Sequence, residues 1–500
     1  MTKTGLCLLA LAVGGAAACE HDDYDDGDYC YGDCDPDPVP LAVDDHIMID
    51  EDQPITFAML KANDENVNYL SKIIVPPEHG TFENGEYHPE PGYFGVDQFT
   101  YEGTQEYSSY PRAKSQATAY ILIKSDGIPY EHSKLVGAAN ADDMAVGDFN
   151  GDGKTDLVTC NYNTNEMSIF INTTVAEGEY SLEKHVFEGG NSPRHLAAGD
   201  VDGDGKIDIV VATHEGVTMF RNLTTQPGGL LAFDGPTKLG NASTTDVELV
   251  DLQGDGVLDL VATSEGWYPS GNLDVWLNQS TPGTFAFGAK TSFSTPYTAL
   301  QLMAVDADAN GKPDLAILAD EKLSLFLNAM TVGAVTPAFQ ARLDRDTGPN
   351  PKSMFLADLD GDAAPELGVL HDYGDMWIYA NQGATSPTFE AARVIDIQTT
   401  TELVATAEVD GDGHIDLIGA AQGTAPFELL ANRSLPQQYA FESTDALIAD
   451  VDTHKRASFG RPTAMVFVDL DGVPPQEIVV SLKSGNVYSS APGLRVLYGK

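Results

Sequence analysis

The 500-residue chain has few basic residues, few cysteines and few tryptophans. Lysine and arginine total 27 against 76 aspartates and glutamates, so the formal net charge is −49, and there are 5 cysteines and 3 tryptophans. Such an excess of negative charge repels the phosphates of nucleic acid, which excludes nucleic acid as a partner. After residue 18, no apolar stretch is long enough to form a transmembrane helix.

Sequence signatures of common catalytic sites are absent as well. There is no GxSxG, no HExxH and no phosphate-binding GxxxxGK[S/T], and the 11 histidines are scattered along the chain. A lone histidine such as His195 is more often structural than catalytic. We therefore expect a protein that is not an enzyme. The alternative is the scaffold of a secreted enzyme that acts on carbohydrates or lipids.

What the chain does have is one short acidic loop in seven copies. The second copy reads DVDGDGKIDIV, and the copies begin at Asp148, Asp200, Asp251, Asp306, Asp358, Glu408 and Asp469. Successive copies start 50 to 61 residues apart. A repeat of this period indicates stacked or radial units, each too small to bury a core alone.

Each loop places oxygen-bearing side chains at its first, third, fifth and ninth positions. In the second copy these are Asp200, Asp202, Asp204 and Asp208. Carboxylates this close repel one another unless a cation lies between them, and Ca²⁺ takes about six to eight oxygen ligands. The seventh position, Lys206 in this copy, would offer its backbone carbonyl, so its side chain can vary.

The first six loops therefore supply the predicted Ca²⁺ ligands. They are Asp148, Asn150, Asp152, Lys154, Asp156, Asp200, Asp202, Asp204, Lys206, Asp208, Asp251, Gln253, Asp255, Val257, Asp259, Asp306, Asp308, Asn310, Lys312, Asp314, Asp358, Asp360, Asp362, Ala364, Glu366, Glu408, Asp410, Asp412, His414 and Asp416. In the seventh loop Val473 occupies the fifth position and two prolines follow it. We expect that loop to bind Ca²⁺ weakly or not at all.

An EF-hand loop begins in the same way, but it requires a glutamate at its twelfth position and helices on both sides. No copy has an acidic residue there. The ninth position instead leads into an apolar, β-branched stretch such as residues 207–211, which predicts a strand. The loop should therefore join two strands. A single copy could be a plain Asp/Gly turn, but seven copies in register argue against that alternative.

A second repeated pattern is a strand that ends in asparagine. The asparagines are Asn172, Asn222, Asn278, Asn328, Asn381 and Asn432, which we interpret as turn residues at strand ends. Two residues earlier stands a large apolar residue: Phe170, Phe220, Trp276, Phe326, Tyr379 or Leu430. Strands that are apolar on both faces lie between neighbouring sheets, as in blades around an axis.

These motifs resemble the FG-GAP/VCBS repeat family, the repeats of integrin α-subunit β-propellers, over residues 128–500. The resemblance implies four-stranded blades with a Ca²⁺-binding loop between two strands, and seven copies imply seven blades. Such propellers usually close by pairing strands from the two ends of the domain. Here residues 132–136 would complete the last blade beside residues 494–498.

Residues 39–125 resemble the cadherin-like bacterial Ig repeat, chiefly in PGYFGVDQFTY from Pro91. The resemblance implies a small β-sandwich with Phe94, Phe99 and Tyr101 as core or turn aromatics. The acidic or amide residues matching possible Ca²⁺ positions of that family are Asp50, Glu51, Asn63, Asp64 and Asp97.

The N-terminal segment predicts export and anchoring. Residues 1–18 have the charge and apolar run of a signal peptide. Ala16 to Cys19 resembles a bacterial lipobox, with Cys19 lipidated; ordinary cleavage after Ala18 is the alternative. Residues 19–38 form an acidic tether, in which Cys30 and Cys34 are close enough in sequence for a local disulfide.

Together these patterns predict an all-β protein, a seven-bladed β-propeller preceded by a small Ig-like β-sandwich. We expect a Ca²⁺-binding lipoprotein that is secreted across the inner membrane, held by its lipid at the outer membrane or cell surface, and active as an adhesion module. Its ligand would be an unknown protein or glycan, and only the lipid anchor would contact the membrane. Trp267 and Tyr268 could stack on a sugar, although a turn role is the simpler interpretation.

Overall fold

A computed structural model describes the protein from residue 40 to residue 498 with gaps. The described residues are 40–50, 53–77, 79–90, 95–104, 114–124, 132–137, 141–175, 180–266, 270–372, 374–381, 387–389, 393–397, 401–408, 414–421, 427–432, 434, 441–444, 461–471, 476–483 and 493–498. The predicted signal peptide, the acidic tether, Cys19, Cys30, Cys34, Phe94, Trp267 and Tyr268 lie outside these residues.

The first folded unit is a β-sandwich. One sheet has the order β1 (Asp45–Asp50), β7 (Lys114–Lys124), β6 (Gly95–Thr104), β3 (Tyr69–Val75); the other has β2 (Ile55–Thr56), β5 (Glu86–Pro89), β4 (Gly80–Glu83), and a short helix α1 (Phe57–Leu60) follows β2. Tyr87, Phe99 and Tyr101 are fully buried between the sheets. The predicted core role of Phe99 and Tyr101 is confirmed.

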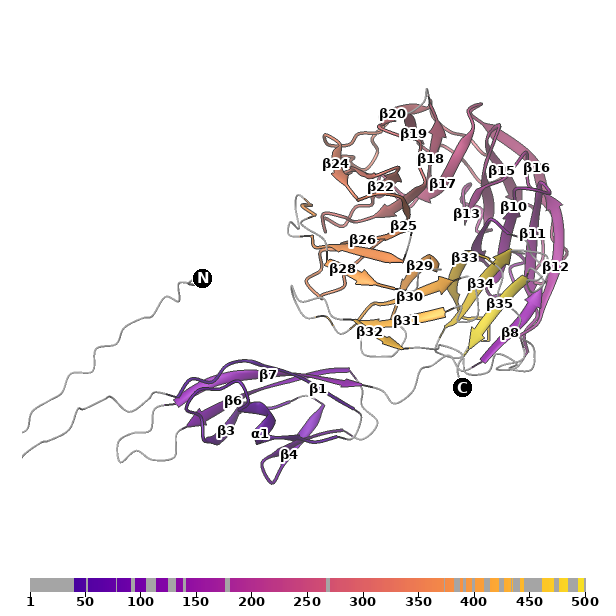
Figure 1. Ribbon diagram of the computed structural model, residues 1–500. Helices are drawn as coiled ribbons and strands as arrows, with labels where there is room; N and C mark the ends of the chain where they lie inside the picture. Colours follow the sequence, from indigo (N-terminus) through magenta and orange to yellow (C-terminus); the bar gives the residue numbers. More distant parts are fainter. Residues whose placement is uncertain are drawn as a thin grey trace, which may run out of the picture.

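The rest of the described chain forms seven four-stranded antiparallel sheets, which are the blades of a propeller (Figure 1). Blade 1 contains β9 (Asp143–Gly147), β10 (Asp156–Asn161), β11 (Glu166–Asn172) and β12 (Leu182–Glu188), blade 2 contains β13 (His195–Gly199), β14 (Asp208–Thr213), β15 (Gly216–Asn222) and β16 (Phe233–Leu239), and blade 3 contains β17 (Thr244–Val250), β18 (Asp259–Glu265), β19 (Gly271–Trp276) and β20 (Thr291–Thr295). Blade 4 contains β21 (Gln301–Val305), β22 (Asp314–Ala319), β23 (Lys322–Phe326) and β24 (Leu343–Asp346), and blade 5 contains β25 (Pro351–Ala357), β26 (Glu366–His371), β27 (Asp375–Tyr379) and β28 (Arg393–Asp396). Blade 6 contains β29 (Thr401–Ala407), β30 (Asp416–Ala421), β31 (Phe427–Asn432) and β32 (Phe441–Thr444), and blade 7 contains β33 (Arg461–Val468), β34 (Glu477–Lys483), β35 (Gly493–Tyr498) and β8 (His132–Gly137). The predicted seven-bladed propeller is therefore confirmed.

Two strands from opposite ends of the domain close the ring. The strand β8 pairs antiparallel with β35, with His132 opposite Tyr498, so the first strand of the domain is the outermost strand of blade 7 (Figure 1). The first strands of neighbouring blades pack against one another all the way round, including β33 of blade 7 against β9 of blade 1. The predicted closure is confirmed.

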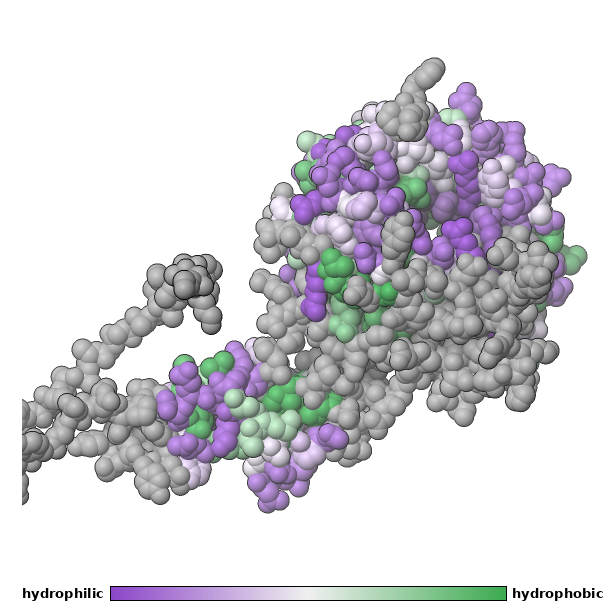
Figure 2. Space-filling model, viewed as in Figure 1, coloured by the Kyte–Doolittle hydropathy of each residue, from purple (hydrophilic) through white to green (hydrophobic). Residues whose placement is uncertain are grey.

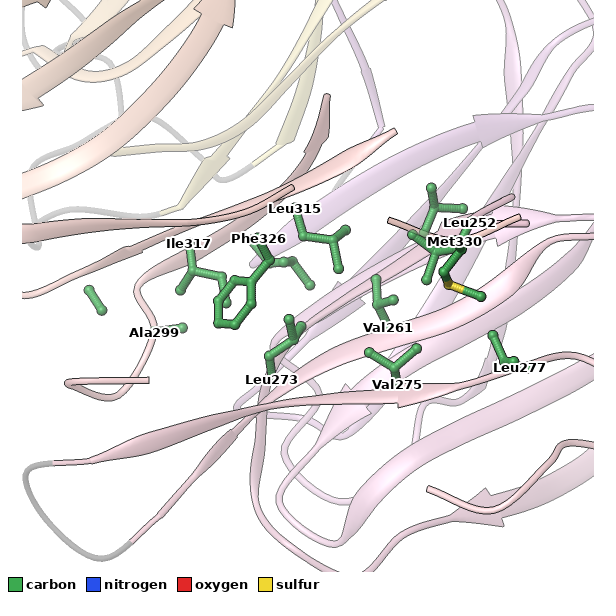
Figure 3. Close-up of a cluster of buried hydrophobic side chains, with 13 residues drawn as sticks. Leu252, Val261, Leu273, Val275, Leu277, Ala299, Leu315, Ile317, Phe326 and Met330 are labelled. Atoms are coloured by element: carbon green, nitrogen blue, oxygen red, sulfur yellow. The ribbon is translucent and has the colours of Figure 1, made fainter. Parts of the chain in front are cut away.

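The core of the propeller lies between neighbouring blades. Leu273 and Val275 of blade 3, for example, pack with Leu315, Ile317 and Phe326 of blade 4 (Figure 3). Burying each such side chain contributes about 1.5–3 kcal/mol. The second strands are buried on both faces, as β14 is throughout, which explains why their sequences are continuously apolar.

Cys160 of β10 is a buried free thiol in this core, and burial raises its pKa well above the usual range, as expected for a packing residue. On the propeller, the side chains seen in Figure 2 are mostly hydrophilic, in keeping with the large net charge. Within the described residues, no helix has the length and apolar character needed to cross a membrane.

Candidate metal centres

Every acidic loop joins the first strand of a blade to the second. In the second copy Asp200 directly follows β13 and Asp208 is the first residue of β14. The other six copies have the same placement. The prediction that the loop connects two strands is confirmed, and the loops therefore gather at equivalent places around the ring.

The first carboxylate of the loop holds the backbone that turns around it. Asp200 Oδ1 accepts hydrogen bonds from the N–H groups of Gly203, at 2.8 Å, and Asp204, at 3.1 Å, and its Oδ2 accepts one from Gly205 at 2.8 Å. Gly203 and Gly205 adopt φ values of 74° and 84°, which glycine reaches without strain. Asp148 and Asp251 make the same three bonds in their loops.

The ninth residue of the loop is buried and ties two strands together. Asp208 is fully buried; its Oδ2 accepts the N–H of Val201 at 3.0 Å and its Oδ1 the N–H of Asn222 at 2.8 Å. Burial raises the pKa of this carboxyl to about 6, although both N–H donors act to lower it. The equivalent residues behave alike, with pKa values also raised to about 6: Asp156, Asp259 and Asp314.

In four loops the first, third and ninth side chains converge. Their ligand atoms lie within 4.8 Å of one another in the groups Asp200–Asp202–Asp208, Asp306–Asp308–Asp314, Asp358–Asp360–Glu366 and Asp469–Asp471–Glu477. The fifth position, also predicted as a ligand, is not part of these groups. Asp204 Oδ1, for instance, accepts the N–H of Lys206 at 3.0 Å.

One atom shows that a cation fits this arrangement. Asp308 is 4% exposed, and its Oδ1 is buried without a hydrogen-bond donor. An unpaired buried carboxylate oxygen is costly, and a bound cation would remove that cost. With Asp306 and Asp314 beside it, the site offers only hard oxygen donors, which suits Ca²⁺.

The first and third loops depart from this pattern at the third position. Asn150 donates its amide to Asp152 Oδ2 at 3.1 Å, and Gln253 donates to the carbonyl of Ala334 in blade 4 at 2.6 Å. In the sixth loop Asp410 and Asp412 lie outside the described residues. Among the seventh-position residues, Lys154 and Lys312 direct their ammonium groups to backbone carbonyls beyond the loop.

The seventh loop has an unexpected partner. Its group Asp469–Asp471–Glu477 is met by the Tyr180 hydroxyl of blade 1, which lies 3.0 Å from Asp471 Oδ2 and 3.0 Å from Glu477 Oε1. Burial raises the pKa of Glu477 to about 7. Val473 lies outside the described residues, so weak binding at this loop stays a prediction.

The strand-end asparagines connect one blade to the next. Asn222 Nδ2 donates to the carbonyl of Phe149 in the loop of blade 1, at 2.9 Å, and to that of Ile207 in its own loop, at 3.1 Å. Asn278, Asn328, Asn381 and Asn432 make the corresponding pair of bonds. The sequence analysis interpreted these residues as turn residues and did not predict their bonds between blades. The recurrence of asparagine at the same position of six repeats was the available indication of such a role.

In the Ig-like unit the acidic residues bond to separate partners. Asp64 accepts the N–H of Val43 at 2.8 Å and the Tyr101 hydroxyl at 3.3 Å, whereas Asp97 accepts the Tyr87 hydroxyl at 2.8 Å. These bonds give the carboxylates a role within the sandwich.

Two family models match the chain. The FG-GAP-like repeat matches residues 148–211, 200–262 and 251–317, and the bacterial Ig domain matches residues 37–108. The chain therefore contains three FG-GAP-like repeats and an N-terminal bacterial Ig domain. The matched repeats cover the first four acidic loops, and the Ig match covers the first six strands of the sandwich.

No curated protein matches this chain. Among solved structures, BBS1N in complex with ARL6DN, soaked with mercury, is similar at 14% identity and a TM-score of 0.48, over 74% of this chain and 96% of that chain. An Agrocybe aegerita lectin that recognises non-reducing terminal N-acetylglucosamine is similar at 15% identity and a TM-score of 0.43, over 72% and 91%. At these scores neither likeness bears on function.

The combination of FG-GAP repeats and an Ig-like domain suggests a binding or adhesion module and is typical of extracellular or surface proteins. The aspartate groups in the loops could bind calcium.

Proposed function

We propose that this chain is a Ca²⁺-stabilised, lipid-anchored surface protein that binds a protein or glycan ligand and does not catalyse a reaction. The observation that carries the calcium part is the buried, donor-free Oδ1 of Asp308 beside Asp306 and Asp314. The same convergence is present in the loops of blades 2 and 5, and we expect one ion per intact loop, about six in all.

Calcium would stabilise contacts between blades as well as each loop. Asp202 Oδ2 also accepts the N–H of Gly283, from the next blade, at 2.9 Å. In the first loop the carbonyl of Asn150 likewise accepts the N–H of Gly228 in blade 2 at 3.0 Å. An ion bound to the third position would therefore also stabilise the contact between two blades. Its contribution to the free energy of unfolding grows with the logarithm of the free Ca²⁺ concentration relative to the dissociation constant.

Removal of calcium tests this function. Excess EGTA should lower the melting temperature, and Mg²⁺ should not restore it, because Mg²⁺ demands a smaller, more regular site. Native mass spectrometry should count about six ions, and about one fewer in Asp308→Asn, which keeps the side-chain shape. Glu183→Gln, on an exposed residue outside the loops, is the matched control. An unchanged melting curve in EGTA would contradict the calcium proposal.

The anchor is tested separately through Cys19→Ser. A lipidated cysteine buries several acyl chains' worth of CH₂ groups, which is enough for stable membrane attachment. Without it the acidic protein has nothing apolar to insert, so the variant should move to the soluble fraction. Retention of the variant in a carbonate-washed membrane pellet would show that the protein is not held by this lipid.

A further inference from the structure

A groove with aromatic and polar walls lies between blades 4 and 5. It has a volume of about 710 Å³ and is lined by Asp344, Arg345, Asp346 and Gly348 on the blade 4 side and by Trp377, Tyr379 and Val394 of blade 5. This volume is typical of small-molecule sites. Because the blades are repeats of one unit, each lining residue can be compared with its equivalents in the other blades.

Trp377 stands four residues before the strand-end asparagine of blade 5. The equivalent residues of the other blades with this pattern are Ser168, Thr218, Asp274, Ser324 and Glu428. All of these are polar or acidic, so the repeat itself does not require an indole here. Trp377 is only partly buried, which leaves part of its ring available to a ligand.

Tyr379 occupies the large apolar position two residues before the asparagine. Blades 1, 2 and 4 have Phe170, Phe220 and Phe326 there, so the fold needs the ring and not the hydroxyl. Tyr379 is 3% exposed, and its hydroxyl is buried with no hydrogen-bond partner. Burial raises the pKa of this phenol to about 12, so it stays protonated and can both donate and accept.

Arg345 lies in the outer strand β24, opposite Leu323. The residues at the equivalent register in blades 1, 2, 3 and 5 are all apolar: Phe187, Leu239, Phe293 and Ile395. The guanidinium carbon lies 5.4 Å from the ring centre of Tyr379, and Arg345 Nε is buried without an acceptor.

The charges around Arg345 are already paired with other groups. Asp344 accepts two bonds from Arg342, at 2.8 and 2.9 Å, and Asp346 pairs with Lys322. Arg345 has no ion-pair partner among the described residues. Two buried polar groups without partners, Arg345 Nε and the Tyr379 hydroxyl, therefore belong to neighbouring side chains that line the groove.

The indole is held in place before any ligand arrives. Its ring centre lies 4.9 Å from that of His371. Gly348 adopts a φ of 86°, and a Cβ there would lie 2.9 Å from the ring of Trp377. Only glycine permits this approach, so the orientation of Trp377 is fixed by its neighbours, and binding requires little ordering.

We propose that this groove binds a neutral pyranose unit of a glycan. The C–H face of the sugar would stack on Trp377. A shift of the partly buried Arg345 side chain would let the sugar hydroxyls reach Arg345 Nε and the Tyr379 hydroxyl, which are both buried without partners before binding. Neutral sugars are favoured because the net charge of −49 repels anions. A purely apolar ligand would leave both polar groups unpaired. The inference rests on the proposed role as a binding module and specifies its ligand class.

The test uses the purified protein with calcium, a panel of methyl pyranosides observed by saturation-transfer NMR, and an array of neutral and acidic glycans. At least one neutral pyranoside should bind. Trp377→Ala should weaken binding about tenfold or more. Tyr379→Phe should weaken it about threefold to tenfold while the melting temperature stays the same or rises, because the variant introduces the residue found in three other blades.

Trp276→Phe, at a buried tryptophan of blade 3, is the matched control and should bind like the wild type. The groove assignment is overturned if no pyranoside binds at millimolar concentration, if Trp377→Ala and Tyr379→Phe both bind normally, or if only acidic glycans bind in a Trp377-dependent way. Each of these results leaves the EGTA and Cys19→Ser tests of the proposed function unaffected, so the two can fail independently.

Discussion

The Tyr180 hydroxyl of blade 1 lies 3.0 Å from Oε1 of Glu477 in blade 7. It reaches across the seam where the ring closes, into the seventh acidic loop. The closing seam thus places a tyrosine hydroxyl among carboxylates that in other blades offer a cation site.

Removing this hydroxyl should weaken the seam without affecting calcium. Tyr180→Phe leaves Asp471 and Glu477 with one donor fewer, which should cost about 1–2 kcal/mol of unfolding free energy. In denaturant titrations, the decrease in unfolding free energy from wild type to Tyr180→Phe should be equal with and without EGTA. Tyr162→Phe, at a 41% exposed tyrosine, serves as control. A loss that disappears in EGTA would mean that the hydroxyl acts through a bound ion.

The strand-end asparagines should be sensitive to the loss of their amide N–H groups. Asn222→Ala leaves the carbonyls of Phe149 and Ile207 without this hydrogen-bond donor, which should lower the unfolding free energy by about 2–3 kcal/mol. Asn222→Asp should be worse, because a carboxylate would face two carbonyl oxygens. Asn163→Ala, in an exposed turn, should change the melting temperature little. Equal melting of Asn222→Ala and Asn163→Ala would rule out the inter-blade role.

The fifth acidic loop contains a strained residue. Ala363 at its sixth position has a φ of 69°, where Gly153, Gly205 and Gly256 stand in other loops. Ala363→Gly should therefore raise the unfolding free energy by about 1 kcal/mol. Ala364, the adjacent residue, does not have a positive φ, so Ala364→Gly should lower the unfolding free energy. Thermal melting of both variants gives the comparison, and a destabilising Ala363→Gly would refute the strain.

His195 bridges the first strands of three blades. Its Nδ1 lies 3.5 Å from Asp143 Oδ2 and 3.6 Å from Asp246 Oδ1. Burial alone would lower the pKa of His195, but Asp246 and Asp143, with Asp142 beyond them, raise it to about 10. The imidazole is therefore protonated at neutral pH, which supports the structural role expected for it.

The stabilisation from His195 should depend on pH. Because its pKa is higher in the folded state than the usual value of about 6.5, the stabilisation is complete below about pH 6.5 and is lost as the pH rises through 10. Glu248 on β17, with a pKa raised to about 8 by burial, acts in the same direction.

The measurement compares wild type with His195→Gln in denaturant titrations from pH 6 to pH 10. The side chain is 36% exposed, so solvent screening should limit the difference to about 1 kcal/mol at pH 6. That difference should shrink steadily towards pH 10. His185→Gln, paired only with exposed Glu183, is the control. A difference that is constant with pH would show that His195 contributes through packing and not through charge.

The repeats made the fold predictable from sequence. Seven loops at a steady period fix the number of blades, and the apolar stretch after Asp208 fixes where the second strand begins. Contacts between blades were not predictable, because they join residues far apart in the chain. The pairing of Tyr180 with Glu477 and the groove formed by Arg345, Trp377 and Tyr379 depend on which strand edges meet, and sequence spacing does not encode that.

The site was predictable in its residue types and less so in its details. The first, third and ninth positions converge as expected in four loops. The fifth position does not join them. Both oxygens of Asp204, for example, are bonded to Lys206, Oδ1 to its N–H and Oδ2 to its ammonium group. This local bond between a side-chain oxygen and the N–H two residues later, an Asx turn, competes with a cation for Asp204 Oδ1.

The strand β8 has a mechanical consequence, because it joins the N-terminal segment to the ring it closes. Tension applied from the N-terminal side passes through residues 125–131 to His132, the first residue of that strand. It is resisted there by the ladder to β35 before it reaches any other blade. A pull from the N-terminal side is therefore borne first by the pairing of β8 with β35, whereas the contact of β33 with β9 between blades 7 and 1 is loaded only after that strand has been peeled away.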